Sequence, residues 1–299
     1  MMQIASPFPA EIRRVGVFSC SGTPDAERMA QGTQRMREWG VEVVPAQIAG
    51  GSVRYLAGSD EARAQSLQGF YSDDTLSFLM ASRGGFGVTR LLDKFDWELL
   101  RAKEKWLCGY SDVTALLLAA YAHGCRKLIH GPMLCSTFGR EDTPALAETV
   151  ASFGQCLRRE PTTARCEVLR EGTVCGPIIP CNLTMLCSLL GTKHVPDLRG
   201  CILALEDVHE PAHSIERNLV HLESAGVLRG IGGLLLGQFT EGEDAEYLPE
   251  IFAEWGSKLT VPVASGLPFG HGLPSISILF GAEVTLCCQK GLVQFKYRS

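Results

Sequence analysis

Three residue types that together can cleave an acyl bond occur in the order Ser…Glu…His, each directly after an apolar run. Ser111 stands in the Gly-Tyr-Ser-Asp segment 109–112, between the strand-like run 105–108 and the helix-prone run 113–121. Glu206 follows the apolar run 201–205, and His271 lies in a glycine-rich turn after the run 261–265. A serine hydroxyl is a weak nucleophile, so it needs a base such as neutral histidine, and a carboxylate on the other ring nitrogen fixes the tautomer of that base. The chain therefore supplies the groups for nucleophilic hydrolysis.

Each of these residues also has an ordinary structural interpretation. Ser111 can cap the helix that follows it, as serine often does at such a place. Glu206 and Asp207 can form a solvated turn, and His271 can be an exposed loop residue. On composition alone the base could be any other histidine, namely His123, His130, His194, His209, His213 or His221.

A second glycine-rich segment, Arg-Gly-Gly-Phe-Gly at 83–87, allows a close approach of the backbone. A backbone N–H of this loop and the N–H of Asp112 at a helix start can together form an oxyanion hole. A phosphate cradle is the rival interpretation, but the segment lacks the Lys-Ser/Thr ending of a P-loop and the G-x-G-x-x-G spacing. Nucleotide binding is therefore disfavoured, and an ordinary turn is the third alternative.

The first half of the chain alternates between strand and helix patterns, which predicts an α/β fold with a parallel sheet covered on both faces. In such sheets the ligand crevice lies at the carboxyl ends of the strands, where Ser111 is placed. The predicted strands are 15–19, 41–44, 76–81, 106–108 and 127–130, and the predicted helices are 24–39, 60–71, 96–103 and 113–123.

The polar stretch 136–171 indicates a bridge between two domains, with a helix over 145–153 that ends before Gly154. We therefore predict an N-terminal domain 1–140, a linker 141–172 and a C-terminal domain 173–299. In the last of these, Asn182 is expected to cap a helix that stops at Gly191. Further strands are predicted at 201–205, 234–236 and 261–265, helices at 214–225 and 245–255, and short antiparallel strands in the last thirty residues.

The composition is that of a globular protein with a sizeable core: 299 residues, 45% hydrophobic and 20% charged. A net charge of −5 argues against nucleic acid or an anionic membrane as the main partner. The twelve cysteines form no C-x-x-C pair and no zinc-ligand pattern, so we expect buried thiols and neither metal nor cofactor. We see no signal-peptide pattern and no apolar stretch of about 18 residues, which favours the cytoplasm.

Several segments together resemble the L,D-carboxypeptidase family of serine peptidases, which includes murein tetrapeptide carboxypeptidase and the microcin-C immunity hydrolases. The resemblance runs from Val15 to about Gly281, and its specific parts are the Gly-Tyr-Ser-Asp turn and the Glu-Asp-Val segment 206–208. The segments occur in matching order at 15–22, 83–87, 109–116, 130–133, 182–184, 205–208, 210–211 and 270–271.

The resemblance implies a role for each matching position. The nucleophile falls on Ser111, the acid on Glu206 with Glu210 in reserve, and the base on His271. The backbone of Gly85, or of a neighbour, and that of Asp112 would hold the oxyanion. It also implies a Rossmann-like N-terminal domain, a smaller C-terminal domain of β-sandwich or swivelling type, a site between them and a homodimer.

The substrate implied by the resemblance is a murein tetrapeptide, cleaved between the L-centre of a diamino acid and a terminal D-Ala during peptidoglycan recycling. The D-Ala carboxylate needs a cation, for which Arg83, Arg90 and Arg140 are candidates. One departure concerns the segment before Asn182, where the family usually has Gly-Gly and this chain has Pro180-Cys181. If that segment contacts substrate, the specificity is expected to shift.

Three other functions compete with this one. The first is hydrolysis of an acyl-sulfamoyl or aminoacyl nucleotide on the same scaffold, which the lack of a Trp-rich insertion between 136 and 171 disfavours. The second is an esterase of the α/β-hydrolase type, which needs Gly-x-Ser-x-Gly where this chain has Val113. The third is a small-ligand binding protein with an inactive site.

Overall fold

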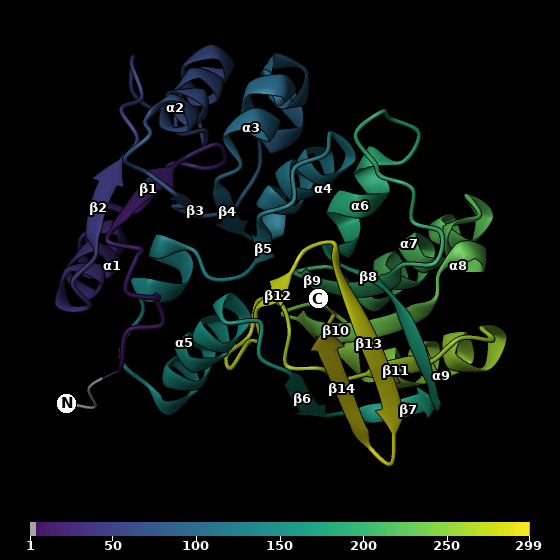
Figure 1. Cartoon of the computed structure of the whole chain (residues 1–299). Helices are drawn as coiled ribbons and strands as arrows, with labels where there is room; N and C mark the ends of the chain where they lie inside the picture. Colours follow the sequence, from purple (N-terminus) through teal and green to yellow (C-terminus); the bar gives the residue numbers. More distant parts are fainter. Residues whose placement is uncertain (1–3, 299) are drawn as a thin grey trace.

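The computed structural model describes residues 4–298, which form two β-sheets with helices packed against them (Figure 1). The first sheet has the order β12-β5-β4-β3-β1-β2, and its first five strands in the chain run parallel. The predicted parallel sheet is therefore confirmed. Its strands are β1 (Arg14–Phe18), β2 (Glu42–Pro45), β3 (Phe78–Ala81), β4 (Trp106–Gly109), β5 (Leu128–His130) and the antiparallel β12 (Ile278–Leu279).

Three helices of the first half begin at polar caps. Asp25, Ser59 and Asp96 each accept a hydrogen bond from a backbone N–H in the first turn of the following helix. The helices are α1 (Ala26–Glu38), α2 (Asp60–Ser72), α3 (Trp97–Lys103) and α4 (Thr114–Ala122), with short 3-10 turns at Val88–Arg90, Leu92–Lys94 and Ser111–Val113 and a π-turn at Leu134–Phe138. Residues 114–120 of α4 are all buried, so this helix is central to the core.

The second sheet is a single mixed sheet of eight strands, with the order β6-β14-β13-β8-β9-β10-β11-β7. Its middle strands β8 to β11 are parallel, and the outer strands are antiparallel to their neighbours. The strands are β6 (Thr162–Arg165), β7 (Glu167–Arg170), β8 (Gly172–Asn182), β9 (Ile202–Val208), β10 (Gly233–Thr240), β11 (Val263–Ser265), β13 (Ala282–Gln289) and β14 (Leu292–Tyr297).

Four helices accompany this sheet, so the C-terminal half is mixed α/β as expected. Asn182 caps the first of them by accepting from the Met185 N–H, and Ile215, Leu219 and Leu222 form the buried face of the second. They are α6 (Leu183–Leu189), α7 (Ala212–Ser224), α8 (Val227–Gly230) and α9 (Leu248–Lys258), with a 3-10 turn at Ala245–Tyr247.

The bridge between the two halves differs from the prediction. Helix α5 (Pro144–Leu157) does not end before Gly154 but runs through it. A Cβ on Gly154 would lie 3.3 Å from Pro7 Cα, so the glycine allows close packing inside the helix. Strands β6 and β7 were missed because they lie at the two ends of the second sheet, where partial exposure leaves polar residues in the pattern.

The exchange of strands between the two halves bears on where one domain ends. Strand β12 comes from the C-terminal half but pairs with β5 of the first sheet. Strands β6 and β7 come from the expected linker 141–172 but belong to the second sheet. The division into 1–140, 141–172 and 173–299 stays a prediction.

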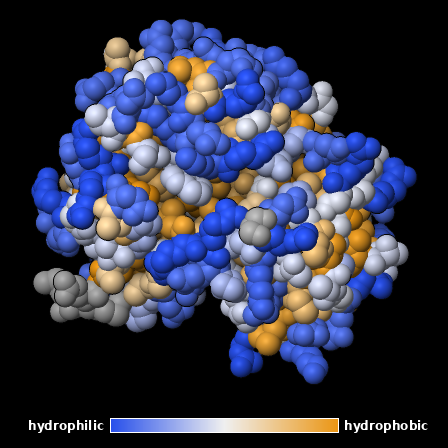
Figure 2. Space-filling view, in the orientation of Figure 1, coloured by the Kyte–Doolittle hydropathy of each residue, from blue (hydrophilic) through white to orange (hydrophobic). Residues whose placement is uncertain are grey.

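The cysteines are free thiols, and most of them are buried. Burial raises the pKa of Cys20 to about 12, which keeps it protonated. Residues 4–298 include no helix long and apolar enough to cross a membrane and no cluster of three or more metal-ligating side chains. Hydrophilic residues predominate on the face shown in Figure 2, with hydrophobic residues visible between them.

Candidate active site

A cleft of about 530 Å³ lies where the carboxyl ends of both sheets meet. From the first sheet it is lined by the loop after β3 and the turn after β4, which carry Gly84 and Ser111. From the second it is lined by the ends of β9 and β10 and by the loop after β11, which carries His271. The strand order β2-β1-β3 places a topological switch point at this edge of the first sheet, the usual position of a ligand crevice in parallel α/β sheets.

Ser111 follows β4 directly and begins the 3-10 turn that leads into α4. Its φ is 63°, in the left-handed region that residues other than glycine rarely adopt. The residue at the N-cap position of this turn is Tyr110 and that of α4 is Val113, so Ser111 does not occupy the cap position that the alternative interpretation requires. A strained backbone around a lone hydroxyl in a cleft is typical of functional positions.

The glycine loop lies directly against this serine. A Cβ on Gly84 would be 2.8 Å from both the Cβ and the Oγ of Ser111, and 3.6 Å from the backbone nitrogen of Asp112. Gly85, the next residue, has a φ of 125°, which favours glycine. The two glycines therefore let the loop approach the Ser111 turn closely.

Asp112 holds the Ser111 turn to the glycine loop, and Arg83 holds that loop to Thr23 after β1. The buried carboxylate of Asp112 accepts from the Val88 N–H at 3.1 Å, and burial raises the pKa of this group against the effect of its hydrogen bonds. The Arg83 guanidinium donates to the carbonyls of Gly84 and Thr23 and also lines the cleft. Arg83 is thus placed both to fix the loop and to meet a ligand.

His271 and Glu206 form a hydrogen-bonded pair. His271 Nδ1 lies 2.6 Å from Glu206 Oε2, and the carboxylate is completely buried. Burial alone would raise the pKa of Glu206, but the charge of His271, its hydrogen bond and the nearby imidazole of His130 outweigh it, so the pKa lies below its usual value. A Cβ on Gly270 would be 2.9 Å from the same carboxylate oxygen, so a glycine is needed here.

Ser111 and His271 come from different halves of the chain and line the same cleft. Among the interactions of residues 4–298, no hydrogen bond joins their side chains. Catalytic hydrogen bonds are often long until substrate is bound, so this arrangement is compatible with a nucleophile and its base. The Tyr110 ring packs against the imidazole of His271 at a centroid distance of 4.9 Å and limits its orientation.

The other acidic candidates near the site are arranged differently. Glu210 lines the cleft but makes no contact with His271 among the interactions of residues 4–298. Asp207 accepts from the Asn182 side chain at 2.8 Å and from the backbone of Thr184 at 2.9 Å, so it anchors the start of α6. The alternative of a solvated turn at 206–207 does not hold, because both residues belong to β9 and are buried.

The other histidines differ from His271 in where they lie and what they contact. His123 stacks on Trp97, and His209 contacts Glu241 at the rim of the cleft. His130 lies at the end of β5, buried beside Glu206, although the sequence analysis gave it no role of its own. Its position at the carboxyl end of a strand of the parallel sheet was a signal that could have identified it.

Two expectations about substrate contacts need correction. Pro180 and Cys181 lie inside β8, paired with β9, and do not line the cleft, whereas the adjacent Asn182 does. Arg90 forms an ion pair with Asp60 at 2.7 Å and is also absent from the lining. Arg83 and Arg140 do line the cleft, together with Arg28.

The close contact at Gly84 leads to a first prediction. Replacing Gly84 by alanine should push the Ser111 side chain aside and lower kcat about a hundredfold, since a misplacement near 1 Å can cost that much. Gly69→Ala is the matched control, because a Cβ at this exposed helical position meets nothing within 4 Å. Equal activity of the two variants, measured with any substrate of the enzyme, would contradict the close-approach argument.

Comparisons with known proteins match the chain over both halves. The family model of the LD-carboxypeptidase N-terminal domain matches residues 15–131, and that of the LD-carboxypeptidase C-terminal domain matches residues 175–286. A putative carboxypeptidase of Synechocystis is 33% identical over 288 residues, which cover 94% of each chain. The murein tetrapeptide carboxypeptidase of Pseudomonas aeruginosa is 34% identical over 248 residues, 78% of this chain and 80% of that one.

Solved structures match equally far along the chain. The muramoyltetrapeptide carboxypeptidase from Oxalobacter formigenes superposes with a TM-score of 0.88 at 27% identity, over 96% of this chain and 99% of that one. The microcin C7 self immunity protein MccF superposes with a TM-score of 0.89, over 99% of both chains. At 23% identity, the second likeness shows a shared fold.

Proposed function

The chain belongs to the LD-carboxypeptidase family, and from this premise we propose that it is a serine carboxypeptidase that releases the terminal D-Ala of murein tetrapeptides. The observation that carries the proposal is the buried Glu206–His271 pair in the same cleft as the strained Ser111. Each of the three groups has the chemical type that acyl transfer through a serine requires.

In the proposed reaction, His271 takes the proton of the Ser111 hydroxyl through Nε2 while Oγ attacks the carbonyl carbon of the L-centre. The oxyanion that forms is held by the backbone N–H groups of Gly85 and Asp112. Glu206 stabilises the imidazolium through Nδ1. The imidazolium then gives its proton to the nitrogen of D-Ala, the C–N bond breaks, and water hydrolyses the acyl-enzyme with His271 as base.

We assign the terminal carboxylate of the substrate to the arginine side of the cleft. Arg28, Arg83 and Arg140 lie on the wall formed by the N-terminal half, and Glu210 and Glu241 lie on the opposite wall. A planar guanidinium can bind a carboxylate through two parallel hydrogen bonds. The basic wall therefore suits the D-Ala carboxylate, and the acidic wall suits the side-chain ammonium of a diamino acid.

Replacing Arg83 by glutamine tests this assignment. The variant should raise KM for a tetrapeptide about tenfold or more, because it loses a hydrogen bond to a charged group. A tetrapeptide with an amidated C-terminus lacks the negative charge and should respond much less to the same substitution. Arg37→Gln on α1, outside the cleft, is the control. Equal effects on the acid and the amide would contradict a role in carboxylate binding.

The alternative on the same scaffold is hydrolysis of an acyl or aminoacyl nucleotide. It is supported by the fold shared with the microcin C7 immunity protein, whereas relatives at 30% identity and above carry carboxypeptidase names. Turnover of a murein tetrapeptide and of an acyl-sulfamoyl nucleotide, measured side by side, separates the two. We expect D-Ala release with the larger kcat/KM, and a reversed preference would replace the proposal by the alternative.

We further propose that the enzyme acts in the cytoplasm as a homodimer, as is usual in the family, and takes part in peptidoglycan recycling. Light scattering of the purified chain should give twice the mass of one chain. A monomer at assay concentration with full activity would contradict the dimer. Fractionation of cells should recover the activity with cytoplasmic markers, and its appearance in another fraction would contradict the location.

A further inference from the structure

The buried carboxylate of Glu206 has one oxygen without a partner. Oε2 accepts from His271, but Oε1 is buried and makes no hydrogen bond to any described residue. Nε2 of His130 is also buried and equally without a partner, and it lies 3.9 Å from that oxygen. One potential donor and one potential acceptor thus face each other about 1 Å beyond the length of a hydrogen bond.

Leaving both atoms unpaired is costly, because a buried polar group without a partner retains its full desolvation penalty, and the penalty is larger for a charged group. A neutral imidazole can donate from one nitrogen, and burial holds the pKa of His130 below its usual value despite the nearby carboxylate. His130 is therefore placed to act as a neutral donor to Glu206.

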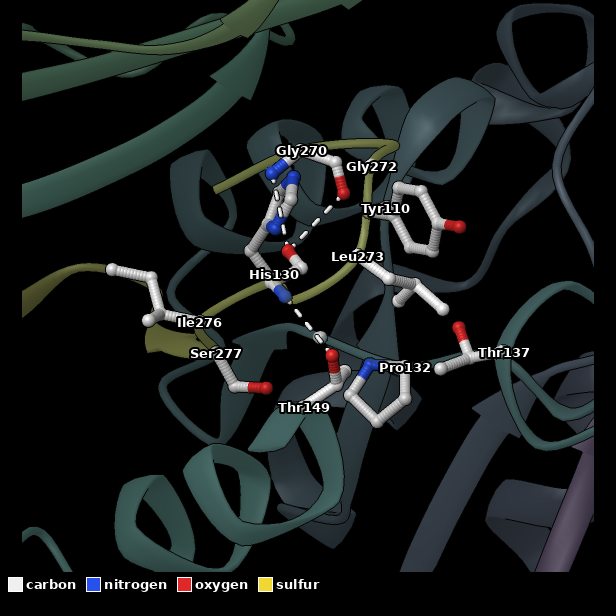
Figure 3. A pocket seen from close by; sticks show the side chains of 12 residues that line it. Tyr110, His130, Pro132, Thr137, Thr149, Gly270, Gly272, Leu273, Ile276 and Ser277 are labelled. Carbon is white, nitrogen blue, oxygen red and sulfur yellow. Dashed lines mark hydrogen bonds between the residues drawn. The ribbon is translucent and has the colours of Figure 1, made fainter. Parts of the chain in front are cut away.

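The surroundings of His130 leave room for its ring to move the remaining distance of about 1 Å towards Glu206. It ends β5, and its ring packs against Phe269 at 4.6 Å and Tyr110 at 5.8 Å. Beside it lies a small cavity of about 20 Å³, bordered also by Gly270 and Thr149, with His130 and Tyr110 on its wall (Figure 3). This space is enough for one water molecule or for a shift of the ring.

We propose that His130 is a positioning residue whose Nε2–H donates to Glu206 Oε1, so that two imidazoles hold the carboxylate. The inference rests on the proposed function. His130 does not line the substrate cleft, so it acts through Glu206 on the orientation and protonation of His271. The bond fixes the carboxylate in the plane that His271 requires and favours the unprotonated form of the Glu206–His271 pair.

The pH dependence of catalysis provides a readout that a merely structural role would not move. A donor to Oε1 stabilises the deprotonated pair, so its removal raises the proton affinity of the pair whichever member binds the proton. The acid limb of kcat/KM should then move to higher pH. Three other titratable groups lie near enough for the charge of Glu206 to raise their pKa: Tyr110, Cys181 and Asp207. None of them is changed in the test.

The test compares His130→Phe, which keeps the ring and removes the donor, with His130→Gln, which restores an N–H at similar reach. His130→Phe should lower kcat/KM about 10- to 100-fold and raise the acid limb by about 1 to 2 pH units, with KM within about threefold of wild type. His130→Gln should recover most of both changes. His213→Phe, on the exposed side of α7, is the histidine control.

Two results would overturn the proposal. One is a folded His130→Phe enzyme with the wild-type acid limb. The other is a His130→Gln enzyme as impaired as His130→Phe, which would indicate packing alone. A measurement independent of any substrate completes the test: nitrogen NMR of the wild type should find the proton of His130 on Nε2, and a proton on Nδ1 alone would reject the bond. Absence of D-Ala release by the wild type would instead reject the proposed function and leave this NMR result to decide on His130.

Discussion

A Ser111→Ala enzyme is expected to release D-Ala from a murein tetrapeptide about 10³- to 10⁶-fold more slowly than the wild type. The reason is that the Ser111 hydroxyl lies directly against the glycine loop, where a Cβ on Gly84 would be 2.8 Å from Oγ. The residual rate should come from binding and from the oxyanion hole alone. The measurement is steady-state release of D-Ala, followed by a coupled amino-acid assay.

Ser136→Ala is the matched control, because Ser136 lines the same cleft. It should keep activity within a few-fold of wild type. Substrate binding to Ser111→Ala, measured by calorimetry, should remain, since the lost hydroxyl contributes to the transition state more than to ground-state binding. A Ser111→Ala enzyme with activity near that of the wild type would remove Ser111 from the mechanism.

Glu206→Gln is expected to lower kcat by up to about 10⁴-fold, with a small change in KM. The amide keeps the shape of the side chain, but it no longer stabilises the imidazolium and can present a donor to His271 Nδ1, which favours the wrong tautomer. The effect should be large because the contact is 2.6 Å long and the carboxylate is completely buried.

Glu210→Gln provides the comparison for this variant, since Glu210 lies in the same cleft without touching His271. Its effect should appear mainly in KM. If the two substitutions lowered kcat equally, the assignment of Glu206 as the partner of His271 in catalysis would be wrong.

The parts of the fold that could be predicted from the sequence are those with a strong local pattern. The alternating strands and helices of the first half follow from apolar runs and from the short turns between them. The capped helix after Asn182 was predicted for the same reason. These features depend on residues that are close together in the sequence, so one sequence is enough to predict them.

The features that were missed depend on partners far away in the sequence. Gly154 has the local pattern of a helix end, yet it lies inside α5 because Pro7 packs against it. Strands β6 and β7 exist because β14 and β11 offer them open edges. His130 of β5 lies 3.9 Å from Glu206 of β9 although the two strands belong to different sheets. No local pattern encodes such contacts.

The candidate site combines both kinds of information. The positions of Ser111, Glu206 and His271 after apolar runs indicated the edge of a sheet, and the family resemblance assigned a role to each. The structure favours Glu206 over Glu210, and His271 over the six other histidines, because His271 Nδ1 lies 2.6 Å from Glu206 Oε2. The roles of all six residues, Ser111, Glu206, His271, Gly85, Asp112 and Arg83, stay predictions.

The central claim is that Ser111 and His271 act as one catalytic unit across the cleft, and a double-mutant cycle tests it most directly. D-Ala release is measured for the wild type, Ser111→Ala, His271→Ala and the double variant. Residues that act as a unit are strongly non-additive, so the double variant is predicted to be no slower than the slower single variant. A double variant whose loss equals the product of the two single losses would show that the two side chains work independently, and it would contradict the mechanism.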